Sequence, residues 1–459
     1  MEENRTSGFR MSDIWKRLDR LEGDKVILII ILLLLLISFL AIFSSTPLLP
    51  AQESRLETMK EHGIIAVFGV GLMALLYHFD IKWIKYLSQA GFVLSFILLT
   101  MLLMKVDLGF IHVETRNSAT RNFVMFNKQI HVFEVVKVAM VMYLAWAMNA
   151  IGEDKEARKV RKKPDTLLFA NWLARVSPKL KFVKKTFWKR MIYVYIPSLV
   201  IVVMIFFGSG SSSILMALVL IALMIIGGMP LKELLTAGVI ALLGLGLMLG
   251  INIASDGKLI PRASTFISRL TTDYDMNDLE GLSGDAYYNL LDDIRQPESA
   301  KIAVHEGKIT GKGIGNSTQK YKVDNIYGDY MYSFIIEEYG LLGGILVLIL
   351  YVSLLARSSI IARMCENDFE KFAIGGLAVL ISGQAFMHIL VNVDIGPMTG
   401  QTLPLISHGS SAFLVFCIAF GIILSISRLA KRKIQNAEML TAMAKNDIEA
   451  NIEAAEKSE

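Results

Sequence analysis

Long apolar segments separated by polar stretches make up most of the chain. Residues 26–43 are almost entirely Ile, Leu, Val and Phe, and an apolar run of this length is typical of a transmembrane helix. Similar runs recur along the sequence, so the pattern predicts an all-α integral membrane protein with about ten transmembrane helices. Their expected ranges are 25–43, 62–78, 84–104, 131–150, 191–207, 213–229, 232–253, 333–356, 373–394 and 410–427.

The distribution of Lys and Arg predicts the orientation of these helices. The segment 151–190 is rich in both residues, and a second basic cluster follows the last span at 428–433. Basic segments stay on the cytoplasmic side of a membrane. We therefore expect both termini to be cytoplasmic and the long segment 254–332 to lie outside, where its length indicates a function. The other segments expected outside are 44–61, 105–130 and 395–409.

By composition the chain divides into three parts. Residues 1–24 form a cytoplasmic segment, within which 11–23 has the apolar spacing of an amphipathic helix lying on the membrane. Residues 25–428 form the membrane domain. Residues 429–459 form a polar tail rich in Ala, Glu and Lys, for which a helix and a disordered segment both remain open.

Composition also narrows the classes of function. A hydrophobic content of 54% and a mean hydropathy of +0.50 argue against a string of soluble domains. The cysteines and histidines show no metal-ligand spacing, so no built-in metal or other cofactor is expected. The basic run 158–163 indicates topology and contact with anionic membrane lipids, and no nucleic-acid partner is expected.

The stretch 307–340 is a candidate for the chemistry. Its many glycines permit a flexible backbone and close approach of other groups. A single acid, Asp329, stands directly before an apolar helix that carries Glu337 and Glu338. One interpretation places a catalytic base at the mouth of a membrane helix. The other is a solvated loop that ends in a helix-capping aspartate.

Other charged residues near the outer surface are candidates for binding an anion. Glu134 and Lys137 share a helix face, either as a structural ion pair or as a cation positioned for phosphate, and Arg121 precedes them. Arg262 and Arg269 open the long outer segment. There they could bind a lipid-linked pyrophosphate through their guanidinium groups or anchor the chain at the membrane surface.

Helix-breaking residues interrupt the segment 392–411. It contains Pro397, Gly400 and Pro404, and irregular backbone at membrane depth is tolerated only against protein or a polar cavity. We therefore expect this segment to line the same outward cavity as Asp329.

These motifs together resemble the SEDS family (shape, elongation, division and sporulation), whose members include FtsW and RodA. GKGIGNSTQK at 311–320 is similar to the family's G-x-G-x-G-x-S-x-Q-K, and DYMYSFIIEEYGLLGG at 329–344 is similar to its D-F-I-F…E-E-x-G-x-x-G. TLPLISHGSS at 402–411 is similar to its T-L-P-x-I-S-Y-G-G-S. Single positions of further family motifs also match, namely Arg121, Glu134, Lys137 and Gln296.

The chain departs from the family pattern at several positions. Asn122 replaces a Trp, and His408 and Ser410 replace a Tyr and a Gly. The family's Asp-Leu-Gly motif after the fifth span is replaced by Gly-Ser-Gly-Ser at 208–211. The last difference affects substrate contacts, whereas the acid at Asp329 and its neighbours are retained.

The resemblance implies a ten-helix bundle in the bacterial inner membrane that polymerises lipid II onto a lipid-linked glycan strand, with Asp329 as the catalytic base. It implies a class B penicillin-binding protein (FtsI-like) and other division proteins as partners. A divalent cation, Mg²⁺ or Mn²⁺, could accompany the pyrophosphate. The expected substrate-binding residues are Arg121, Glu134, Lys137, Arg262, Arg269, Gln296, Gly313, Gly315, Ser317, Gln319, Lys320, Glu337, Glu338, Thr402, Pro404 and Ser407.

Two other functions stay open at this point. A flippase or transporter for lipid II would need no base, and a scaffold of a division or elongation complex would perform no chemistry. The GQTLPLIS stretch at 400–407 and the charged tail favour an FtsW-like role at the division septum over a role in elongation.

Overall fold

The computed structural model describes residues 22–46, 55–106, 109, 111–116, 119–125, 128–159, 167, 169, 172, 182–254, 283–323, 326–396 and 399–456. Arg262, Arg269 and nearly all of the amphipathic segment expected at 11–23 lie outside these ranges.

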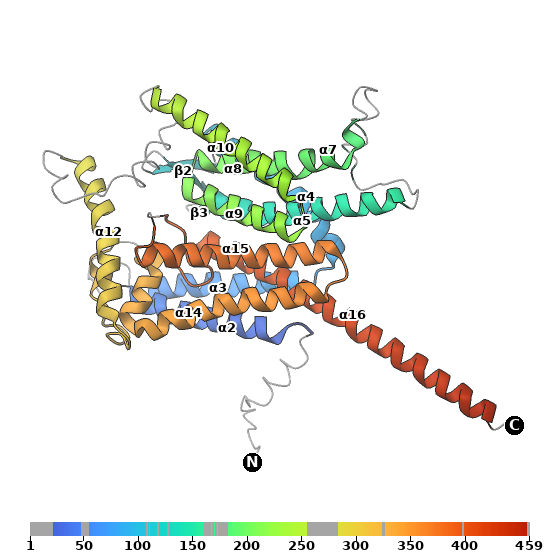
Figure 1. Cartoon of the computed structure of the whole chain (residues 1–459). Coiled ribbons are helices and arrows are strands. Elements are labelled where there is room, and N and C mark those ends of the chain that lie inside the picture. Colours follow the sequence, from blue (N-terminus) through green and yellow to red (C-terminus); the bar gives the residue numbers. More distant parts are fainter. Residues whose placement is uncertain are drawn as a thin grey trace, which may run out of the picture.

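The apolar segments form a bundle of helices (Figure 1). Eight helical stretches of the described chain are long and apolar enough to cross a membrane. The shorter apolar α9 and the helix α10 occupy the other two ranges that the sequence predicts as spans. The helices in the predicted ranges are α2 (Lys25–Ser45), α3 (Arg55–Tyr77), α4 (Ile81–Leu103), α5 (Val132–Lys159), α7 (Thr186–Arg190) continued by η2 (Met191–Tyr195) and α8 (Ile196–Phe206), α9 (Gly210–Ile226), α10 (Leu231–Ala254), α14 (Met331–Met364), α15 (Asp368–Asn392) and α16 (Ser410–Glu456).

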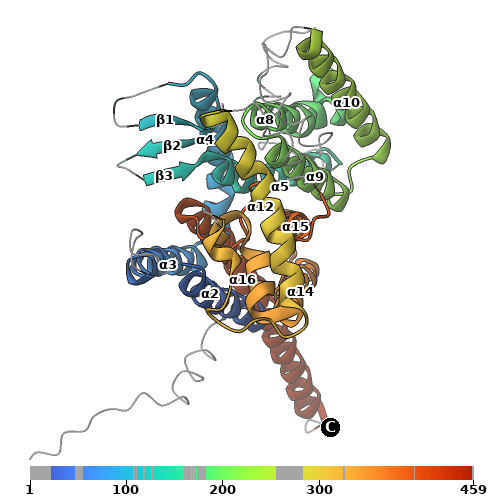
Figure 2. The same cartoon turned by 90° about the vertical axis from the view of Figure 1, so that its left-hand side faces the viewer.

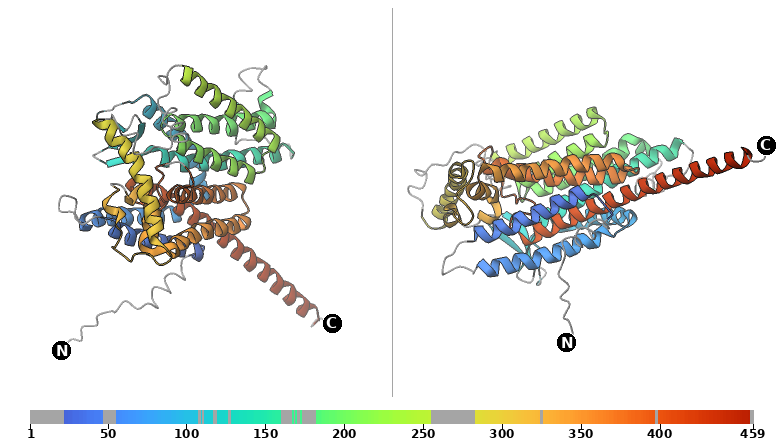
Figure 3. Two further views of the ribbon diagram at one scale, coloured as in Figure 1. Left: turned by 60° about the vertical axis from the view of Figure 1, so that its left-hand side comes forward. Right: turned by 90° about the horizontal axis from the view of Figure 1, so that it is seen from below.

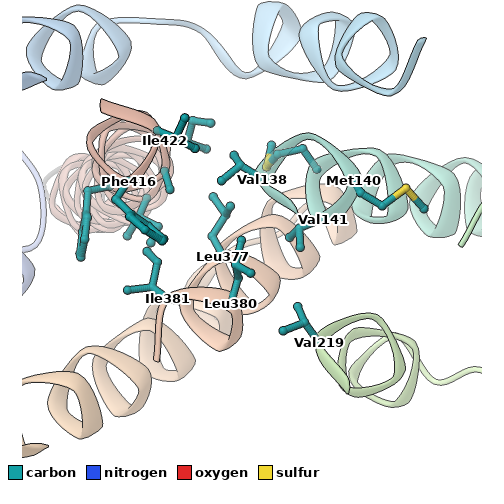
Figure 4. Close-up of a cluster of buried hydrophobic side chains, with 14 of the residues drawn as sticks. Val138, Met140, Val141, Val219, Leu377, Leu380, Ile381, Phe416 and Ile422 are labelled. Carbon is teal, nitrogen blue, oxygen red and sulfur yellow. The ribbon is translucent and has the colours of Figure 1, made fainter. Parts of the chain in front are cut away.

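Helix α15 lies in the middle of the bundle. It packs against α5, α9, α14 and α16. Figure 4 shows Leu377 and Ile381 of α15 among Val141 of α5, Val219 of α9 and Phe416 of α16. Because lipid is as apolar as these side chains, close packing rather than exclusion of water holds such helices together. The polar residues of α15 are therefore well placed to reach several neighbouring elements.

A small antiparallel sheet was not predicted from the sequence. Strands β1 (Ile111–Arg116), β2 (Ala119–Met125) and β3 (Lys128–His131) pair in the order β1-β2-β3. They occupy most of the segment 105–130, which the sequence predicts as an outer connection. Among the described side chains of this segment, Phe123 alone is deeply buried. The membrane bundle is all-α as predicted, and the sheet is an addition to one end of it.

Helix α12 (Asp285–Gly307) crosses the same end of the bundle (Figures 1 and 2). It packs mainly on α14. Its Lys301 forms ion pairs with Glu298 at 3.0 Å and with Asp394 at 3.1 Å, beyond the end of α15. Hydrogen bonds to Glu298 and Asp394 raise the pKa of Lys301. In the second half of the long outer segment, the chain thus forms a helix that lies across the bundle.

Both described ends of the chain emerge at the opposite end of the bundle. Asp24 caps α2 by accepting from two backbone N–H groups and also pairs with Arg357 of α14. Its own backbone N–H donates to Ser427 of α16 at 2.8 Å. Helix α16 then continues beyond the bundle to Glu456 (Figure 3). Of the two alternatives for the tail, the structure therefore favours the helix.

Candidate active site

The candidate site is organised around a break in helix α14. Gly340 has φ 73° and ψ −176°, so its backbone cannot continue the helical hydrogen bonding. The glycine-rich loop at 307–315 fills the break. The backbone N–H of Lys312 donates to the carbonyl of Glu337 at 2.9 Å, and that of Leu341 donates to the carbonyl of Lys308 at 2.9 Å. The loop thus satisfies the backbone groups that the break exposes.

Two glycines make this contact possible. A Cβ on Gly340 would lie 2.1 Å from the carbonyl oxygen of Ile309, and one on Gly311 would lie 2.2 Å from that of Glu338. Both glycines also have positive φ angles, which other residues adopt only with strain. Gly311 and Gly340 therefore serve backbone-to-backbone contact.

Glu337 is fully buried and binds the loop. Its carboxylate accepts hydrogen bonds from the Ser317 hydroxyl at 2.5 Å, the Thr318 backbone N–H at 2.9 Å and the Lys312 ammonium at 2.9 Å. Lys312 also donates to Glu306 of α12, and this hydrogen bond lowers the pKa of Glu306. Glu337 thus joins the loop to α14, and Lys312 joins both to α12.

Glu338 binds the other side of the loop. It accepts from the Ser44 hydroxyl of α2 at 2.5 Å and from the Gly315 backbone N–H at 3.1 Å. The buried ammonium of Lys320 donates to the carbonyls of Ser44 at 3.1 Å and Gly315 at 2.7 Å, with Glu338 3.8 Å away. Sequence reasoning missed Ser44, because nothing near it in the chain signals a partner almost 300 residues away. Most of the polar groups of this motif are engaged with one another.

Asp329 ends the short helix α13 (Ile326–Asp329) and is only partly buried. Two residues from a later part of the chain hold the backbone next to Asp329. The carbonyl of Tyr327 accepts from the His408 backbone N–H at 2.8 Å, and that of Gly328 accepts from the Ser407 hydroxyl at 2.8 Å. Part of the segment 392–411 therefore lies beside the acid, and the outward cavity that the two are expected to share stays a prediction.

The corner where α13 meets α14, residues 327–333, is held from its other side by helix α15. The side-chain amide of Asn392 donates to the carbonyl of Asp329 at 3.1 Å and accepts from the backbone N–H of Ser333 at 2.9 Å. Nε2 of His388 lies 3.4 Å from the backbone N of Tyr332. Sequence reasoning missed both residues. The signal was available, because two polar side chains four residues apart in an apolar span share a face and are functional candidates.

The segment 399–407 is tied to the bundle through its backbone. The carbonyl of Pro404 accepts from the Tyr351 hydroxyl at 2.6 Å, and that of Thr402 accepts from the side chain of Gln384 at 3.0 Å. Leu405 has a positive φ of 63°, which is uncommon for a branched residue and requires surrounding structure to hold it. Two of the predicted site residues, Thr402 and Pro404, are thus fixed against the helices.

Lys137 lies inside the bundle with no exposed surface. Its ammonium donates to Glu134 at 2.7 Å, to Gln384 at 2.5 Å and to Gln401 at 3.0 Å. These three acceptors use all three ammonium protons. Gln401 in turn donates to Ser212 at 2.8 Å. The predicted ion pair between Glu134 and Lys137 is present, and it belongs to a network that reaches the segment 399–407.

The remaining candidates lie around this core. Gln296 is half-buried on α12, and Gln319 is buried with its amide donating to Thr318 at 3.3 Å. Arg121 belongs to β2, but its side chain lies outside the described part of the structure. Among the described residues, no group of three or more His, Cys, Asp or Glu side chains is placed to hold a metal ion.

A comparison with protein families identifies the family of this chain. The model of the FtsW/RodA/SpoVE family, described as "Cell cycle protein", matches residues 24–432. This chain is a member of that family. The resemblance inferred from the motifs is confirmed, and the match covers every predicted site residue.

Curated relatives of this FtsW/RodA-type chain carry the name "Probable peptidoglycan glycosyltransferase FtsW". The protein from Xanthomonas oryzae pv. oryzae is 25% identical over 434 residues, which cover 93% of this chain and 78% of that protein. The protein from Hahella chejuensis is 36% identical over 146 residues, which cover 31% of this chain and 37% of the relative. The chain therefore spans little more than a third of the length of some relatives that it matches.

Solved structures show the same fold. A chain from a peptidoglycan synthase complex that coordinates polymerization and crosslinking aligns with a TM-score of 0.59 at 19% identity, covering 89% of this chain and 99% of that one. The rod shape determining protein RodA of Thermus thermophilus aligns with a TM-score of 0.53 at 17% identity, covering 89% and 98%. This chain is thus a multi-pass bacterial membrane protein with the fold of its family.

Proposed function

We propose that this chain is an inverting peptidoglycan glycosyltransferase that polymerises lipid II, with Asp329 as the general base. Membership of the FtsW/RodA/SpoVE family and the names of the relatives support this function. The observation that carries the role of Asp329 is its position. It is partly exposed on a corner held from several sides, whereas Glu337 and Glu338 are buried and bound to the glycine-rich loop.

The proposed reaction needs one base. The acceptor sugar hydroxyl attacks the anomeric carbon of the donor, the bond from that carbon to the lipid pyrophosphate breaks, and the hydroxyl proton passes to the Asp329 carboxylate. Attack from the face opposite the leaving group converts an α-linked donor into a β-linked product. Pyrophosphate is already a good leaving group, so the base supplies the proton transfer that the reaction lacks.

Cationic side chains would neutralise the departing pyrophosphate. Arg121, Arg262 and Arg269 are the proposed groups, because guanidinium binds phosphate oxygens in pairs. A divalent cation held partly by the substrate phosphates, as Mg²⁺ often is, would share this charge. Gln296, half-buried on α12, is proposed to bind the substrate.

The other predicted substrate-binding residues take a different part in this proposal. The buried groups of the glycine-rich loop shape the floor of the site rather than bind substrate. They do so through the contacts of Glu337 with Ser317 and of Glu338 with Gly315. Lys137 and Glu134 fix the segment 399–407 through Gln401.

We further propose a class B penicillin-binding protein as the partner and the division septum as the location. The similar chain in the peptidoglycan synthase complex, which couples polymerization to crosslinking, supports such a partner. In this proposal both termini are cytoplasmic and the candidate active site faces outward, as the basic residues of segment 151–190 indicate.

The test is polymerisation by purified protein. The chain is combined with its penicillin-binding partner and labelled lipid II in detergent, and glycan strands are sought on a gel. Asp329→Asn keeps size and polarity but removes basicity, so the rate should fall by roughly 10²–10⁴-fold. Asp368→Asn, an exposed acid at the other end of the bundle, is the matched control and should keep its rate.

Other outcomes would point to other functions. Wild-type-like strand synthesis by Asp329→Asn would contradict the assigned base. Transfer of lipid II across vesicles without polymer would support a flippase. The absence of both activities would support a scaffold.

A further inference from the structure

Three consecutive backbone carbonyls lead up to and include the proposed base, and each is held by a donor from a distant part of the chain. The donors are the His408 backbone N–H to Tyr327, the Ser407 hydroxyl to Gly328 and the Asn392 amide to Asp329. We propose that Ser407 and Asn392 are positioning residues that fix the direction of the Asp329 carboxylate. This inference rests on the proposed function and reassigns Ser407 from substrate binding.

The short helix α13 needs these donors. It has only four residues, so its carbonyls lie at a helix end, where intrahelical partners are missing. Ser407 and Asn392 are 4% and 1% exposed, and water therefore does not readily replace them. Removing Ser407 leaves the buried Gly328 carbonyl unsatisfied, and removing Asn392 frees the partly buried Asp329 carbonyl, so either change allows this segment to turn.

Asn392 acts on both sides of the corner. Its amide nitrogen binds the last residue of α13, and its amide oxygen binds the Ser333 N–H in the first turn of α14. One side chain thus sets the angle between the two helices at Tyr330, which has φ −121° and ψ 24°. His388, one turn earlier, has its Nε2 near the Tyr332 N–H and its Nδ1 2.6 Å from the carbonyl of Gln401.

A base must point at the hydroxyl that it deprotonates. A misplacement of about 1 Å in a catalytic group can cost about 10²-fold in rate. The hydrogen bonds of Ser407 and Asn392 go to backbone and not to the carboxylate. Their loss should therefore lower the rate at saturating lipid II and leave substrate affinity nearly unchanged.

The experiment compares two matched Ser→Ala variants in the full chain with its partner. Ser407→Ala removes the bond to Gly328 and the 3.0 Å bond that the hydroxyl accepts from the Leu403 backbone N–H. Ser382→Ala removes an equally buried hydroxyl that donates to the carbonyl of Tyr351 at 3.1 Å, deeper in the bundle. Asn392→Leu removes the bonds of that amide to Asp329 and Ser333, together with its 2.9 Å bond to the His388 carbonyl one turn earlier. Ser407→Thr restores a hydroxyl. The readouts are kcat and KM with labelled lipid II, the Tm, and hydrogen exchange of the backbone amides in 326–336.

We expect kcat to fall about 10- to 100-fold in Ser407→Ala and Asn392→Leu, with KM within twofold and Tm close to that of Ser382→Ala. Ser407→Thr should recover most of the rate. Exchange in 326–336 should rise in Asn392→Leu and stay unchanged in Ser382→Ala.

Several outcomes would overturn the inference. It is wrong if Asn392→Leu and Ser407→Ala polymerise like Ser382→Ala, or if their loss of rate follows a matching loss of Tm. It is also wrong if exchange in 326–336 does not change in Asn392→Leu. Failure of the proposed function is a separate result, because it appears as normal polymerisation by Asp329→Asn or as no polymerisation by the wild type.

Discussion

Lys137 places an ammonium group deep inside the membrane bundle. A buried charge is tolerated when it is paired and hydrogen-bonded, and here Glu134, Gln384 and Gln401 accept all three ammonium protons. The same Gln401 offers its backbone carbonyl to His388, beside the start of α14. A residue with no exposed surface is therefore linked to the corner that carries Asp329.

We predict that Lys137→Met strands the Glu134 carboxylate and destabilises the protein by about 3–5 kcal/mol, the usual cost of an unpaired buried charge. The double variant Glu134→Gln with Lys137→Met removes that charge and should return to normal membrane abundance. We expect it still to polymerise poorly, because Gln401 loses its anchor. Abundance and polymer yield are scored separately, and a double variant normal in both would leave the pair a purely structural role.

At the scale of elements, α14 is two helices joined by a contact with a loop. The residues that follow Gly340 are apolar. Hydropathy alone therefore predicts one continuous span and gives no sign of the break. The backbone bonds of Lys312 and Leu341 across the break make the loop part of the helix. The acid-bearing corner, the loop and α2 are thereby joined as one unit.

We predict that Gly340→Ala breaks the contact between the glycine-rich loop and α14. The added Cβ would meet the carbonyl oxygen of Ile309 at 2.1 Å. In addition, φ 73° by itself strains an alanine by about 1–3 kcal/mol. The Tm in detergent should fall clearly, and polymerisation should fall with it. Gly375→Ala on α15 is the control, because a Cβ there has nothing within 4 Å. It should be neutral or slightly stabilising, and equal Tm values for the two variants would contradict the role of Gly340.

In the whole molecule, the candidate active site and the chain ends lie at opposite ends of the bundle. The sheet and α12 gather at one end, and α16 leaves from the other (Figures 1 and 3). Asp24 binds Arg357 and Ser427 at this second end.

We predict that the α12 end faces outward. Single cysteines at Ser283 and Glu366, both exposed, are introduced after Cys365 and Cys417 have been replaced. An impermeant thiol reagent applied to intact cells should label position 283 and spare position 366, because the basic segments hold the other end inside. The reverse labelling would overturn the orientation.

The sequence by itself determined the long apolar helices, because about 20 apolar residues are needed to cross hydrocarbon and such runs are local. It also determined the family, and it associated the segment 392–411 with Asp329. Only the tertiary structure decided how the buried polar groups pair. Ser44 with Glu338, Lys137 with Gln401 and Asn392 with Asp329 are far apart in the chain. Such hydrogen bonds leave no periodic pattern in the sequence, since they depend on which helix faces meet. For the same reason the sheet β1–β3, the course of α12 and the break at Gly340 became visible only in the folded molecule.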